Sequence, residues 1–195
     1  MQPVTEKSSK TDREKFSRRS MLGLVGGMVA APRLLAQPPN RMRPQAGDEL
    51  VFDEGPLQGE VVRPGLLELN ARPISAMARD PATGVVRNGS RLNRVMLTRI
   101  EAQRLTPRFQ PNAADGIVAY SAVCTHTGCD VFNWDEDQLR MACPCHESQF
   151  DIYDGGRVVG GPAPRPLAML PLEIVGDTVR VAGPFRGRVG FQQAF

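Results

Sequence analysis

The chain has 195 residues, an aromatic content of only 6%, and many turn-forming residues, with 19 glycines and 17 prolines. This composition favours one domain of short strands and loops over a helical bundle. Seven of the 24 basic residues and three of the 21 acidic residues fall within residues 1–36, so the rest of the chain is nearly neutral. Nucleic-acid binding needs cations clustered against phosphate, and the sequence gives no support for that function.

The first predicted element is an export signal in residues 1–36. A charged stretch ends in Ser17-Arg18-Arg19 and is followed by the apolar run 21–31. Paired arginines directly before such a run are typical of a twin-arginine signal, so we expect a periplasmic protein. The run is shorter than the roughly 20 apolar residues that span a bilayer. We therefore expect cleavage near residue 36, with an uncleaved N-terminus held at the inner membrane as the alternative.

Residues 37–47 contain three prolines and are predicted to form an extended linker. From residue 48 to 195 the pattern predicts a single all-β, antiparallel domain. The candidate strands are 49–52, 74–78, 92–100, 116–123, 170–175 and 178–181. Residues 103–115 are predicted to form a loop. The last two strands are expected to pair across Gly176-Asp177, which is a hairpin signal.

Two short motifs hold all four cysteines and both histidines of the chain. The first motif is Cys124-Thr-His-Thr-Gly-Cys129, and the second begins at Cys143 with Cys-Pro-Cys-His-Glu-Ser-Gln-Phe-Asp. Core packing does not explain such a concentration. Thiolates are soft ligands that suit iron–sulfur clusters, and imidazole suits iron and zinc.

Four protein ligands are available in these motifs: Cys124, His126, Cys143 and His146. Two neutral histidines in place of two thiolates make a two-iron cluster easier to reduce, with a potential of about −150 to +300 mV. An imidazole also has a second nitrogen, and reduction of the adjacent iron favours its protonation. Electron and proton uptake would then be coupled, which suits quinol oxidation.

The other two cysteines, Cys129 and Cys145, admit two interpretations. They are either buried free thiols or a disulfide between the motifs. Their matched positions in the two motifs favour the disulfide, and an exported protein is found where disulfides persist.

Together the motifs resemble those of high-potential Rieske proteins, over residues 117–182 most clearly. These are the iron–sulfur subunits of cytochrome bc complexes and the small subunit of arsenite oxidase. The resemblance implies one [2Fe-2S] cluster, with Cys124 and Cys143 on the inner iron and His126 and His146 on the outer iron. It also implies an antiparallel β domain with a small cluster-binding subdomain at about 122–165.

Further site residues follow from the same resemblance. It implies that Cys129 and Cys145 form the disulfide and that Ser148 donates a hydrogen bond to a bridging sulfide. Gly161 and Pro162 belong to a stretch, Gly-Gly-Pro-Ala-Pro, that matches the proline loop on the other side of the cluster.

Three residues depart from the pattern of the bc-complex members. Phe150 stands where those proteins usually have a tyrosine that donates a hydrogen bond to a cysteine ligand. Thr127 replaces an apolar residue, and Glu147 replaces a glycine. These departures, with the short apolar run, favour the arsenite-oxidase-like branch, whereas the histidine pair and Ser148 favour the bc-complex branch.

Two functions are therefore expected for an electron-transfer subunit that is not catalytic as an isolated chain. One is the Rieske subunit of a quinol–cytochrome c reductase-like complex, with a b-type or c-type cytochrome as partner. The other is the small subunit, or a shuttle, of a periplasmic molybdenum oxidoreductase.

A zinc site would leave the extra cysteines and Ser148 unexplained. A Rieske oxygenase needs two more histidines, and the chain has none.

One surface feature also has two interpretations. Acidic residues lie between the motifs at Asp130, Asp135, Glu136 and Asp137. A solvated acidic stretch is the expected interpretation, and a docking patch for a basic cytochrome c is the alternative.

Overall fold

A computed structural model of the chain describes residues 37–191, and the predicted export signal lies outside this part. The described residues fold as an almost entirely β structure with antiparallel sheets. Within residues 37–191, no helix combines the length and the apolar character needed to cross a membrane.

The larger sheet has seven strands, and every neighbouring pair in it is antiparallel. In spatial order the strands are β10 (Leu172–Val175), β11 (Thr178–Val181), β1 (Glu49–Phe52), β2 (Ile74–Arg79), β3 (Val95–Arg99), β4 (Ile117–Ser121) and β9 (Met169–Leu170). The predicted hairpin is confirmed, because Val175 pairs with Thr178 across the Gly176-Asp177 turn.

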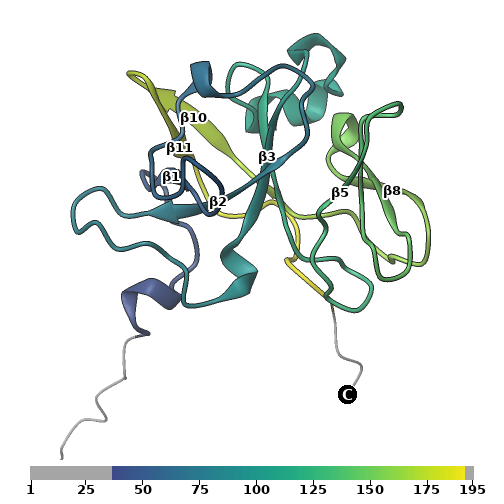
Figure 1. Ribbon diagram of the computed structural model, residues 1–195, viewed down its shortest axis with the longest axis horizontal. Coiled ribbons are helices and arrows are strands. Elements are labelled where there is room, and N and C mark those ends of the chain that lie inside the picture. The colour runs from purple at the N-terminus through teal and green to yellow at the C-terminus, as the bar shows by residue number, and fades with distance from the viewer. Residues whose placement is uncertain (1–36, 192–195) are drawn as a thin grey trace, which may run out of the picture. The chain divides into compact units, whose positions relative to one another are not determined.

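The smaller sheet has four antiparallel strands and contains the second cysteine–histidine motif (Figure 1). Its strands, in spatial and chain order, are β5 (Asn133–Asp135), β6 (Arg140–Ala142), β7 (Gln149–Asp151) and β8 (Arg157–Gly160). This sheet lies inside the range of about 122–165 expected for the cluster-binding subdomain, and the bounds of that subdomain stay a prediction.

Short 3₁₀ helices connect the strands of both sheets. They are η1 (Pro39–Arg41), η2 (Pro64–Leu66), η3 (Arg91–Asn93), η4 (Ala102–Arg104), η5 (Pro107–Asn112) and η6 (Ile152–Asp154). Two of these elements differ from the prediction. The strand expected from residue 92 begins only at Val95, because the Ser90 side chain accepts from the Leu92 N–H and starts η3. The loop expected at 103–115 contains η5.

Two hydrophobic cores share strand β4. Ile117 and Ala119 face the first core, which is formed mainly by side chains of the larger sheet. Val118 and Tyr120 face the second core. The second core also contains Phe150 and both free cysteines. Side chains alternate between the two faces of a strand, so a strand buried on both faces reads as a continuous apolar run. This is why residues 116–123 lack a polar face.

The predicted linker is hydrogen-bonded to the domain. Asn40 accepts from the Gly89 N–H at 2.8 Å, and Gly47 donates to Val181 at 2.8 Å. Asn93, whose side chain is buried, donates to the Met42 carbonyl at 2.7 Å. Residues 37–47 are thus held by the connection between β2 and β3 and by strand β11.

Candidate metal centre

The first loop, residues 124–129, follows the inner strand β4. Its backbone is closed by two hydrogen bonds, from Cys124 N–H to Cys129 C=O at 2.8 Å and from Gly128 N–H to Cys124 C=O at 3.2 Å. Gly128 has a φ of +85°, and a Cβ there would lie 2.5 Å from the Phe191 ring. Only glycine satisfies both conditions without strain.

The second loop, residues 143–148, connects β6 to β7 and closes by the same pattern. Cys143 N–H donates to Ser148 C=O at 2.8 Å, and Glu147 N–H donates to Cys143 C=O at 3.0 Å. Glu147 therefore occupies the position that Gly128 has in the first loop, and its φ is also positive, at +57°. The loop geometry explains why glycine is the favoured residue here.

We predict that Glu147→Gly stabilises the protein. A left-handed conformation costs a non-glycine residue about 1–2 kcal/mol, and the extra freedom of glycine in the unfolded chain offsets about 0.5–1 kcal/mol of this. The free energy of unfolding should rise by roughly 0.5–1 kcal/mol, as measured by urea denaturation. Glu173→Gly, at an exposed strand position, is the matched control and should destabilise. A loss of stability in both variants would contradict the prediction.

The loops bring two thiols and two imidazoles together. Cys124 and Cys143 are free and buried. The rings of His126 and His146 lie edge to face, with their centroids 4.7 Å apart. Burial raises the pKa of the Cys124 thiol, the His126 N–H opposes this, the neighbouring Cys143 thiol raises it further, and Ser148 lowers it. Coordination to a metal would instead favour the thiolate form of Cys124, because a coordinated thiol is deprotonated.

The histidines provide a test of whether these residues fit a metal. The Nδ1 atom of His126 is buried and has no hydrogen-bond partner among residues 37–191. Leaving a buried polar atom unsatisfied costs about 1–3 kcal/mol, so such an atom needs an explanation. A metal bond to Nδ1 supplies one, and the donor set of two thiols and two imidazoles suits an iron–sulfur cluster. The residues therefore fit the predicted group, and their assignment as the four ligands stays a prediction.

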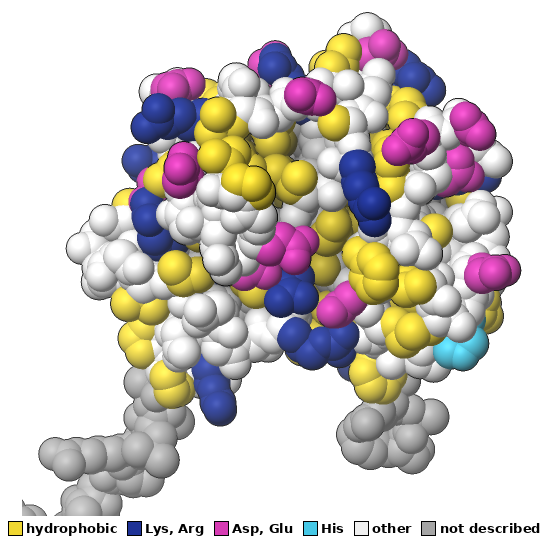
Figure 2. All heavy atoms as spheres, in the orientation of Figure 1, with side chains coloured by type: hydrophobic (Ala, Val, Ile, Leu, Met, Phe, Trp, Pro, Cys, Tyr) yellow, Lys and Arg dark blue, Asp and Glu magenta, His cyan; other side chains and the backbone are white. Residues whose placement is uncertain are grey.

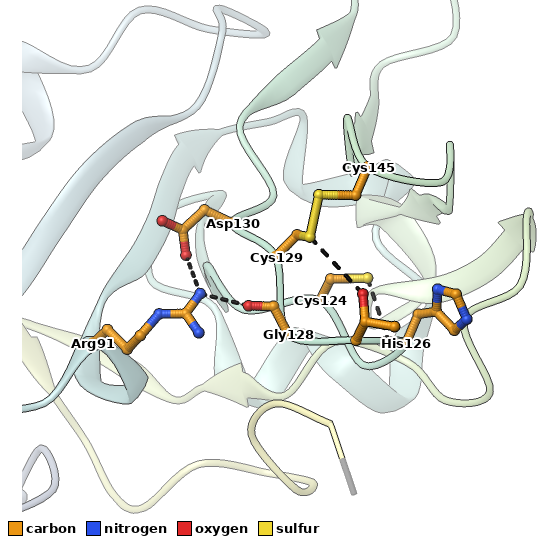
Figure 3. The surroundings of a disulfide bond; sticks show 8 residues. Arg91, Cys124, His126, Gly128, Cys129, Asp130 and Cys145 are labelled. Carbon is orange, nitrogen blue, oxygen red and sulfur yellow. Dashed lines mark hydrogen bonds and ion pairs between the residues drawn. A yellow bond between two sulfur atoms is a disulfide. The ribbon is translucent and has the colours of Figure 1, made fainter. Parts of the chain in front are cut away.

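A disulfide joins the two loops, as the sequence predicts. Cys129 and Cys145 are bonded, with their Cα atoms 6.5 Å apart (Figure 3). The sulfur of Cys143 lies within 4.8 Å of both disulfide sulfurs. Those two sulfurs are already bonded to each other, so this group of three cysteines is not a ligand set. It shows instead that the disulfide packs directly against the site.

Ser148 and the proline loop cover another side of the site. Ser148 is fully buried, and its hydroxyl oxygen accepts from the Ala163 N–H at 3.1 Å. The hydroxyl proton is then available, and the Ser148 side chain lowers the pKa of the Cys124 thiol. Gly161 lies against the backbone of Ser148, and Pro162 next to it is exposed. The structure thus brings Ser148 and the predicted loop together, while the bond to a sulfide stays a prediction.

Phe150 is completely buried in the core beneath the loops. We predict that Phe150→Tyr raises the reduction potential, because the new hydroxyl can donate to a cysteine ligand. A hydrogen bond that differs by about 1 kcal/mol between the two redox states shifts a one-electron potential by ~40 mV. A redox titration measures the shift, and Phe150→Leu, which adds no donor, is the control. An unchanged potential in the tyrosine variant would refute this prediction.

Arg91 is a contact of the site that the sequence did not indicate. Its guanidinium donates to the Gly128 carbonyl and, at 2.7 Å, to the Asp130 carboxylate (Figure 3). Asp130 also lies 3.5 Å from Arg94. Asp130 is therefore ion-paired, with its side chain 38% exposed. Arg91 lies far from the motifs in sequence, and no local pattern marks it.

The contacts of Thr125 and Phe191 were missed because each joins the first loop to a segment far away in the sequence. Thr125 is buried between two predicted ligands, and its hydroxyl donates to the Arg165 carbonyl at 2.6 Å. The Phe191 ring lies on Gly128. These contacts join segments that are distant in the chain, so only the folded structure reveals them.

Comparison with known proteins agrees with this geometry. Residues 83–171 match the family profile of the Rieske [2Fe-2S] domain. A cytochrome bc1 complex Rieske iron-sulfur subunit from Streptomyces lividans is 36% identical over 99 residues, which cover 46% of this chain and 58% of that protein. A putative respiratory nitrate reductase subunit Rieske from Haloferax mediterranei is 47% identical over 76 residues, covering 38% of this chain and 34% of that protein.

One further relative and one solved structure match different shares of the chain. The cytochrome bc1 complex Rieske iron-sulfur subunit of Corynebacterium glutamicum is 35% identical over 149 residues, which cover 69% of this chain and 33% of that protein. The chain therefore spans less than two thirds of each of these relatives. Among solved structures, a cyanobacterial plasma membrane Rieske protein from Synechocystis aligns with a TM-score of 0.35 and 27% identity, covering 55% of this chain and 84% of that one.

Proposed function

Residues 83–171 form a Rieske [2Fe-2S] domain, and from this premise we propose that the protein transfers single electrons as the iron–sulfur subunit of a respiratory quinol–cytochrome c reductase-like complex. The bound cluster supplies one-electron chemistry at a high potential. One observation carries the proposal: the two histidines face each other at the open side of the site, while both free thiols are buried.

One side of the site is buried and the other is exposed to solvent. Cys124 and Cys143 belong to the hydrophobic core, whereas His146 is exposed. A histidine side chain is visible at the edge of the face in Figure 2. Electron transfer requires close approach of a partner, and the exposed His146 allows it. The same exposure lets the second nitrogen of His146 exchange a proton with solvent or with a quinol.

The proposal includes a periplasmic location reached by the twin-arginine route, with an N-terminus that is either cleaved or held at the inner membrane. Two features support it. Arg18-Arg19 precede an apolar run, and the disulfide of Cys129 and Cys145 needs an oxidising compartment. The twin-arginine route exports folded proteins, so a cluster inserted in the cytoplasm would be retained.

A second candidate function has its own support. The Haloferax mediterranei relative is named as a putative Rieske subunit of a respiratory nitrate reductase. Phe150, Thr127 and Glu147 also depart from the pattern of the bc-complex members. We therefore retain an electron-transfer subunit or shuttle of a periplasmic molybdenum oxidoreductase, such as arsenite oxidase, as the alternative.

The test has two stages. The purified protein should be coloured, contain two irons per chain, and give an electron paramagnetic resonance signal when reduced, and Cys143→Ser should lose all three. A colourless zinc protein would overturn the proposal. Purification from the native membrane and periplasm then separates the candidates. Cytochrome b and quinol-dependent reduction support the first function, and a molybdenum-containing subunit supports the second.

A further inference from the structure

A crevice of about 530 Å³ lies between η5, η6, residues 165–167 before β9, and residues 186–188 near the C-terminus. Five arginines form its rim: Arg108, Arg157, Arg165, Arg186 and Arg188. We refer to it as the arginine crevice. None of these arginines is a predicted ligand, and nothing in the proposed function so far uses the crevice.

The floor of the arginine crevice is apolar. Leu167 and Met169 lie there, each with 2% exposure, beside the Phe109 ring. The ring covers Gly155, where a Cβ would come within 2.1 Å of it. The guanidinium of Arg108 stacks over the same ring, 4.5 Å from its centroid. An apolar floor inside a cationic rim fits an apolar side chain surrounded by carboxylates better than it fits a simple anion.

The rim carries unneutralised charge. Arg108 and Arg157 both pair with Asp154, at 3.4 and 2.6 Å. For Arg165, Arg186 and Arg188, no carboxylate of residues 37–191 lies within 4.0 Å. Arg186 and Arg188 are also exposed. Three guanidinium groups therefore remain to attract an acidic surface.

Arg165 connects the arginine crevice to the metal centre. Its carbonyl accepts from Thr125, which lies between Cys124 and His126, at 2.6 Å. Its guanidinium donates to the carbonyls of Arg188 at 3.3 Å and Gly190 at 2.8 Å. The crevice is thus adjacent to the first loop, and a protein seated on it would have its edge near the histidines.

The acidic groups of the smaller sheet are placed differently. Asp135, Glu136 and Asp137 lie at the β5–β6 turn, and β6 runs from that turn toward Cys143. The acidic turn is therefore at the strand end away from the second loop. Glu147 is an exposed carboxylate beside His146, and it is outnumbered by the three arginines that have no carboxylate of residues 37–191 within 4.0 Å.

We propose that the arginine crevice docks the acidic face of the protein that exchanges electrons with the cluster, with one apolar side chain of that partner on the crevice floor. This inference rests on the proposed function and adds to it the chemistry of the partner. Opposite charges steer diffusional encounter and set association rates more than they set affinity. A basic cytochrome would be repelled from this side of the domain.

The test uses a matched pair of acceptors: a basic c-type cytochrome and the same cytochrome after succinylation, which converts its lysine amines to carboxylates. Stopped-flow spectroscopy follows oxidation of the reduced full-length protein by each. The rate with the acidic cytochrome should fall as ionic strength rises. The double variant Arg186→Gln, Arg188→Gln should slow this reaction about tenfold at low ionic strength and should not slow the reaction with the basic form.

The control is the double variant Arg41→Gln, Arg63→Gln, which removes the same charge at exposed positions outside the crevice. Its rates should match those of the unmodified protein. Equal slowing by both double variants, or no slowing by the crevice variant, would overturn the inference. Arginine-dependent sedimentation with phosphatidylglycerol vesicles, combined with unchanged electron-transfer rates, would overturn it in favour of a lipid surface. A protein without a cluster would instead refute the proposed function.

Discussion

Replacing Gly161 with alanine is expected to lower the free energy of unfolding by about 3 kcal/mol and to release the bound cluster. Gly161 has a φ of +75°, which costs alanine about 1 kcal/mol. A Cβ there would also lie 2.5 Å from the Cα and 2.7 Å from the N of Ser148. These are backbone atoms, which cannot rotate aside as a flexible side chain can. Such overpacking adds about 1–3 kcal/mol. The clash would push the proline loop off Ser148.

Gly176→Ala separates the two causes. Gly176 has a φ of +63°, and no atom of the described residues 37–191 lies within 4 Å of the position of a Cβ there. This control carries the backbone cost alone, so it should lose only about 1 kcal/mol and keep its cluster. Urea denaturation and the iron content per chain provide the measurements. Equal losses in the two variants would show that the contact between Gly161 and Ser148 is unimportant.

Removing the disulfide is expected to have a comparable effect on stability. The bond closes a loop with a sequence separation of 16, and in the chain-entropy model such a loop contributes about 3 kcal/mol. Cys129→Ser with Cys145→Ser should therefore unfold at a lower urea concentration. The variant should also lose its visible absorbance faster in air, because the bond packs against Cys143. The first loop should still form, since Arg91 holds its Gly128 carbonyl from outside.

The comparison for this prediction is the unmodified protein after its disulfide has been reduced. Dithiothreitol should shorten the lifetime of its cluster to that of the double serine variant, and it should leave the variant itself unchanged. A lifetime that is insensitive to dithiothreitol, with the disulfide shown to be reduced, would contradict a protective role. The test also shows whether the bond matters in the folded state, beyond its effect on the unfolded chain.

The two motifs were interpretable from sequence because each is a short local segment. Cys124 and His126 are two residues apart, and Cys143 and His146 are three apart, so one loop conformation places each pair. The soft thiols and neutral imidazoles then indicate an iron–sulfur site. The Gly176 hairpin was equally local, since the chain turns within two residues. Local signals of this kind do not depend on the rest of the fold.

By itself, then, the sequence determined the β class, the two motifs and the candidate ligands. Tertiary structure alone decided which distant groups surround them: Arg91 on the first loop, Phe191 over Gly128, and Arg165 between the metal centre and the arginine crevice. It also showed that Glu147 has the same backbone role as Gly128, through a hydrogen-bond pattern shared by two loops. The physical reason is that these contacts form only when the two sheets and the C-terminal segment pack together.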